Sequence, residues 1–69
     1  MIQLLDVVAL MVDRQDKGLQ RGQVGTIVEE LAEGVYEVEF SDNNGVTYAL
    51  VALKAEQLMI LHYQPLKAS

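Results

Sequence analysis

The sequence predicts a small all-β domain, and three observations support that prediction. Within Val35–Phe40, the apolar Tyr36, Val38 and Phe40 alternate with Glu37 and Glu39, the pattern of a strand with one buried face and one solvated face. Val24–Leu31 is rich in β-branched residues, which suit a pleated sheet. Short segments with glycine or asparagine separate these runs, as turns do between paired strands. A lone hairpin is unstable in water, so the flanking segments must add further strands.

Length and composition restrict the chain to one small domain. Its 69 residues allow a thin core, because a chain of this size buries only about 60% of the surface that it exposes when unfolded. We expect the domain over residues 1–64 and a tail over 65–69. The chain has no cysteine and a single histidine, His62, so disulfides, thiolate zinc sites and imidazole clusters are excluded. No metal and no cofactor are expected, and cysteine-free composition is compatible with a cytoplasmic location.

The charge balance indicates the class of partner. Ten acidic residues against five basic ones give a net charge of −5. Nucleic-acid binding requires clustered lysine and arginine to neutralise phosphates, so DNA and RNA are disfavoured. A basic protein is the partner class that this balance favours.

The first apolar segment, Asp6–Val12, is expected to be a strand. Leucine, alanine and methionine also favour a short buried helix, and periodicity alone does not separate the two in so short a run. Met1–Val12 lacks the basic start and cleavage site of a targeting peptide and is too short to span a bilayer, so no membrane association is expected.

Residues 13–23 are predicted to form an ordered polar loop with Leu19 folded back as an apolar anchor. Gly18, Gly22 and Gly25 follow at spacings that match neither the dinucleotide fingerprint nor the Walker loop. We interpret all three as backbone geometry at a tight corner, and we predict that a side chain does not fit at Gly25.

The remaining elements follow from the same signals. Ala32–Gly34 is a turn between the two strands, and on the second strand Tyr36, Val38 and Phe40 should face the core. Asn44-Gly45 is a strong hairpin-turn dipeptide within Ser41–Gly45, so the turn needs no calcium ion.

The C-terminal part predicts two further strands and a helical turn between them. Val46–Leu53 and Leu58–Tyr63 are the strands, and Lys54–Gln57 is long enough for one helical turn only. Both strands are apolar on both faces.

The motifs of this chain resemble a family of small, uncharacterised bacterial domains common in cyanobacteria, known as a domain of unknown function. The residues that match it are Asp6-Val7-Val8, Gly18-Leu19, Gly22–Val28, Tyr36–Phe40 and Leu53 with Leu58. The order of elements is similar to an SH3-like five-stranded barrel with one helical turn before the last strand. The glycine loop also resembles KOW segments and nitrile-hydratase-type subunits of the SH3-like group. The resemblance implies a fold and no activity.

Catalysis is not expected. Five glutamates gather on the predicted hairpin, at positions 29, 30, 33, 37 and 39, but acid–base work requires desolvated carboxylates, and such a thin core offers little desolvation. His62 is expected to be a strand residue at the sheet edge.

The strongest functional signal is the surplus of apolar residues. Since 51% of the chain is hydrophobic and a barrel has one interior, one face of the last two strands should remain uncovered. We expect a protein partner or a second copy to bind there, through Tyr48, Leu50, Leu61 and Tyr63, although alternation does not fix which face points outward. The alternative is that the chain's own ends, Met1–Leu5 and Pro65-Leu66, fold over this face and no partner is needed.

The sequence therefore predicts a non-enzymatic protein-interaction or subunit-type module. The alternatives are an accessory subunit or an inhibitor- or antitoxin-like partner of an enzyme and, against the charge, a nucleic-acid-binding KOW-like barrel.

Overall fold

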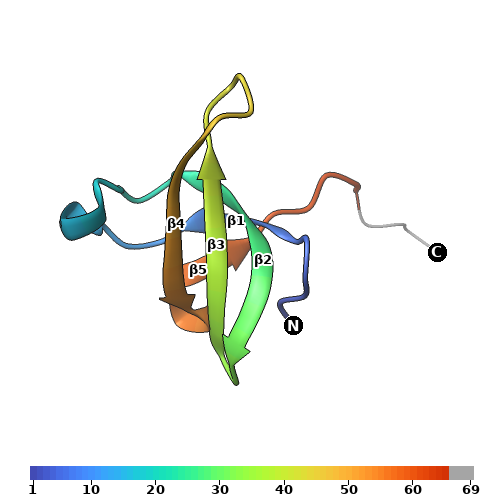
Figure 1. Ribbon diagram of the computed structural model, residues 1–69. Helices are drawn as coiled ribbons and strands as arrows, with labels where there is room; N and C mark the ends of the chain where they lie inside the picture. The colour runs from blue at the N-terminus through green and yellow to red at the C-terminus, as the bar shows by residue number, and fades with distance from the viewer. Residues whose placement is uncertain (66–69) are drawn as a thin grey trace.

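The centre of the fold is the hairpin of β2 (Val24–Ala32) and β3 (Val35–Ser41), which the sequence pattern predicts most clearly (Figure 1). The structure is a computed structural model that describes residues 1–65. One antiparallel sheet has the strand order β4-β3-β2-β1-β5. Its other elements are β1 (Val7–Leu10), η1 (Gln15–Lys17), β4 (Thr47–Lys54), η2 (Ala55–Gln57) and β5 (Leu58–Ile60). The prediction of an all-β fold with five strands and a helical turn before the last strand is confirmed. Among these residues, no helix is long and apolar enough to cross a bilayer.

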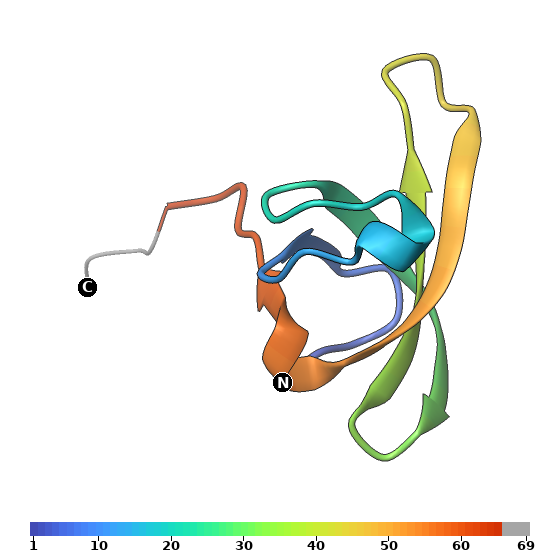
Figure 2. The ribbon, with the colours of Figure 1, turned by 90° about the vertical axis from the view of Figure 1, so that its left-hand side faces the viewer.

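The sheet curls around a single apolar core (Figure 2). Alternation along β3 accounts for the centre of that core: Tyr36, Val38 and Phe40 are buried, while Glu37 and Glu39 lie on the other face and are half-buried. The other large buried side chains are Val8, Leu10, Leu19, Ile27, Val51, Leu53 and Leu58. Leu19 is buried although it belongs to the polar loop, so the predicted anchor is confirmed.

The first segment is a strand and not a helix, but it is shorter than predicted. β1 ends at Leu10, and one further backbone bond continues its register with β5, from the Met11 amide to the Gln57 carbonyl at 2.8 Å. Before β1, the Ile27 amide donates to the Asp6 carbonyl at 2.9 Å, which extends the contact with β2.

The predicted last strand, Leu58–Tyr63, is wrong at its end, because β5 stops at Ile60. β5 pairs with β1, and the last ladder bond runs from the Leu61 amide to the Val7 carbonyl at 2.9 Å. Beyond Val7 the N-terminal chain enters a turn closed by a bond from the Asp6 amide to the Gln3 carbonyl. His62 and Tyr63 therefore have no strand to pair with. The expected tail, 65–69, lies outside the described residues except for Pro65.

Four glycines occupy left-handed backbone that other residues rarely adopt, with φ between 70° and 96°: Gly18, Gly22, Gly34 and Gly45. Val46, expected to start a strand, belongs to the turn before β4 instead. The Asp42 carboxylate accepts hydrogen bonds from the amides of Asn44 (2.8 Å) and Val46 (3.0 Å).

Gly25 differs from these four glycines, because it lies inside β2 and not in a turn. It pairs with Val8 on one side and Phe40 on the other. A Cβ atom there would lie 2.7 Å from Val38 Cγ1 and 2.9 Å from the Glu39 carbonyl oxygen. Close approach of a neighbouring strand, and not a positive φ, explains this glycine.

Candidate functional site

β4 separates into a core face and a surface face although its sequence is apolar on both. Val51 and Leu53 are buried, and Ala49 is half-buried against the core. Leu50 points the other way and is 55% exposed, next to the exposed Ala52. Leu50 lies opposite Glu39, whose side chain is on the solvated face of β3. The structure thus resolves which face of β4 points outward.

Tyr48 is exposed as predicted but does not share a face with Leu50. A register shift between Phe40 and Ser41 leaves Tyr48 as an extra residue at the start of β4. Its ring lies 6.3 Å from that of the buried Phe40, and its hydroxyl accepts a hydrogen bond from Gln23 Nε2 at 3.1 Å. The bulge therefore places Tyr48 between Phe40 of the core and Gln23 of the polar loop.

Leu61 and Tyr63 do not extend the Leu50 surface. β4 and β5 are the two opposite edges of the sheet, with three strands between them. Leu61 is half-buried beside β1, and Tyr63, 79% exposed, follows the end of β5. The four residues expected to form one contact surface thus lie in three separate places.

Several exposed apolar residues were not among the predicted contacts, and two of them lie on either side of β1. Val24 and Met59 are each about half exposed, and both lie opposite Ala9, one on either side of β1. Ala9 is buried between them, although it alternates with the core residues Val8 and Leu10 and therefore lies on the outer face of β1. Met59 could have been predicted from the sequence, because it is two residues from Leu61 and so belongs to the same face of the last apolar segment.

Carboxylates lie next to the exposed part of β4. Glu39 is opposite Leu50 and Glu37 is opposite Ala52, while Glu29 of β2 is opposite Glu37 on its other side. Two like charges that face each other across a strand pair are unfavourable. Along this outer face, apolar β4 residues are thus bordered by acidic residues of β3 and β2.

The polar loop is an ordered excursion next to Tyr48. The backbones of Arg14 and Leu19 form two hydrogen bonds, and Asp13 accepts a bond from the Arg21 amide. A shallow open depression lies within it, lined by Asp13, Gln15, Gly18, Leu19, Gln20 and Gln23. Its lining is mostly polar, and it offers no desolvated acid or base.

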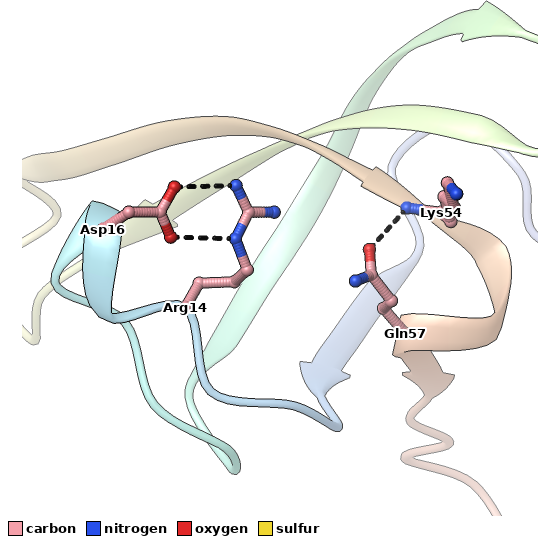
Figure 3. A network of polar contacts seen from close by, with 4 residues as sticks. All are labelled: Arg14, Asp16, Lys54 and Gln57. Carbon is pink, nitrogen blue, oxygen red and sulfur yellow. Dashed lines mark hydrogen bonds and ion pairs between the residues drawn. The ribbon is translucent and has the colours of Figure 1, made fainter.

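An ion pair joins Arg14, directly before η1, to Asp16 within it (Figure 3). Both guanidinium–carboxylate bonds are 3.1 Å long. The hydrogen bond from Arg14 lowers the pKa of Asp16. At the end of β4, Gln57 Oε1 accepts a bond from the Lys54 amide at 2.9 Å, which starts η2 (Figure 3). Both contacts stabilise local structure.

No cluster of three or more histidine, cysteine or acidic side chains that could hold a metal ion occurs in residues 1–65. Comparison with known proteins gives one family match: a model described as Domain of unknown function (DUF4926) matches residues 4–60. No curated protein and no solved structure matches the chain.

Proposed function

The chain belongs to the DUF4926 family of domains of unknown function, and we propose that this member is a non-enzymatic protein-interaction or subunit-type module. We also propose that it is a bacterial, cytoplasmic domain of the SH3-like barrel type. The strand order and the helical turn before the last strand support the SH3-like part of this proposal.

The single observation behind the proposal is the exposure of Leu50. A leucine in the middle of a strand normally contributes to a core, but Leu50 is 55% exposed while Val51 and Leu53, on either side of Ala52, are buried. The described part of the chain ends does not cover it. Apolar side chains on an edge strand favour association with another chain. Leu50 is therefore the centre of the proposed binding surface, and the partner is another protein or a second copy.

Site-specific crosslinking tests this function directly, because the chain contains no cysteine. A Leu50→Cys variant labelled with a maleimide photo-crosslinker carries the probe at one position only. After illumination in a lysate of the source organism, we expect a conjugate of defined mass that excess unlabelled protein competes away. Its mass distinguishes a second copy from another protein.

Asn43→Cys is the matched control, because Asn43 is exposed in the turn before β4 and lies outside the strand that carries Leu50. The control should give no such conjugate. Equal labelling from both positions, or none from position 50 while both variants show unchanged thermal unfolding, would contradict the proposed function.

A further inference from the structure

We propose that the free edge of β4 accepts an extended, basic segment of a partner protein as an additional strand. The inference rests on the proposed function and specifies the partner's chemistry. The segment would place lysine or arginine side chains across Leu50 and Ala52 toward Glu37 and Glu39.

The edge itself is the first argument. Among the described residues, β4 pairs with β3 alone, so the backbone groups on its other side have no strand partner (Figure 1). Edge strands are usually protected from pairing with other chains by charged residues, proline, bulges or short length. β4 has a bulge at Tyr48 and a charge at Lys54, but Ala49–Leu53 between them is uncharged and regular. That stretch is long enough to pair with a short extended segment.

The outer face next to this edge determines the chemistry of the segment. Glu37 has Glu29 and Ala52 as its neighbours across the two strand pairs, and Glu39 has Thr26 and Leu50. None of these neighbours is basic, and the one ion pair in residues 1–65 is that of Arg14 with Asp16, in the loop. Lys54 lies on the same outer face, opposite Val35 and diagonal to Glu37, but it forms no ion pair within residues 1–65. Cations supplied by a partner segment would therefore add attraction that this chain does not provide beside Leu50.

Basic side chains on an added strand can reach the carboxylates of β3. An added strand would lie about two strand spacings, roughly 10 Å, from β3. A lysine or arginine side chain can lay its aliphatic stem along an apolar neighbour and keep its charged end in water. Here the stem would cover Leu50, and the small Ala52 leaves the path to Glu37 open.

Charge also argues against a second copy at this edge. Each chain carries a net charge of −5, so pairing β4 with β4 would bring two acidic outer faces together. A basic segment gains attraction where a second copy meets repulsion.

The test is an NMR titration of the isotope-labelled full chain with an acetylated, amidated nine-residue peptide that alternates lysine and valine. We expect chemical-shift changes centred on residues 49–53 and slower hydrogen exchange of the β4 amides at the free edge. Affinity should weaken severalfold between about 20 mM and about 150 mM salt, because exposed charges are screened. A peptide that alternates glutamate and valine is the probe control and should not bind.

A charge-matched pair of variants separates local attraction from net charge. The double variant Glu37→Gln, Glu39→Gln should lower the affinity for the basic peptide by about fivefold, the scale of two exposed ion pairs. Glu30→Gln with Glu33→Gln removes the same charge but not from the outer face beside Leu50, and it should change the affinity by less than about twofold.

Three outcomes of the titration would overturn the inference: no binding of the basic peptide, shifts confined to other segments, or equal binding of the acidic peptide. A crosslink between two copies through position 50 would also overturn it. That last result would leave the proposed function standing, whereas the absence of any conjugate at position 50 would remove the function itself.

Discussion

The contact between β2 and β3 at Gly25 and the outer face of β4 at Leu50 are opposite cases within one sheet. At Gly25 the strands approach so closely that even one methyl group would collide with Val38 and with the backbone of Glu39. At Leu50 the side chain is more than half exposed and faces a carboxylate on the neighbouring strand. The first region is fixed by packing within the chain. The outer face at Leu50 is apolar but does not contribute to packing within the chain, which is why we propose that a partner binds there.

The largest expected effect is at the crowded position. Gly25→Val should lower the free energy of unfolding by about 3 kcal/mol or more, because overpacking at this site displaces a backbone atom as well as a side chain. A domain of this size has little more stability than that, so the variant should be largely unfolded in a urea melt. An unchanged urea midpoint would show that β2 and β3 can separate at no cost.

A matched glycine separates crowding from backbone conformation. At Gly45 a Cβ atom would have no heavy atom within 4 Å, but φ is 80°. Gly45→Ala should therefore cost about 1 kcal/mol, the scale of a left-handed residue that is not glycine. If Gly45→Ala proved as damaging as Gly25→Val, crowding would not be what distinguishes Gly25.

A small effect of opposite sign is expected at Leu5, an exposed residue with φ of 70°. A leucine in this conformation is strained, and asparagine tolerates it better. Leu5→Asn should raise the free energy of unfolding by about 0.5 kcal/mol, since a side chain that is 75% exposed contributes little burial. Thermal melts at matched pH measure this. A fall in the melting temperature would mean that Leu5 packs against the domain.

The difference between these regions also explains what could be predicted from sequence. Polar alternation fixed the faces of β3, and the Asn-Gly dipeptide fixed the turn before β4, because both signals are local. The parity of β4 could not be predicted, since both of its faces are apolar and only the neighbouring strand decides which is buried. The bulge at Tyr48 and the early end of β5 depend on the partner strands as well. For that reason the four expected contact residues did not fall on one surface.

The most direct test of the account compares lysine at two positions of β4 by equilibrium urea unfolding. Leu53→Lys should cost at least about 3 kcal/mol, because it places an unpaired charge in the core. Leu50→Lys should change the free energy of unfolding by less than about 0.5 kcal/mol, as expected for a surface position. A loss at Leu50 as large as that at Leu53 would contradict the account, because Leu50 would then belong to the core and could not be the centre of a binding surface on β4.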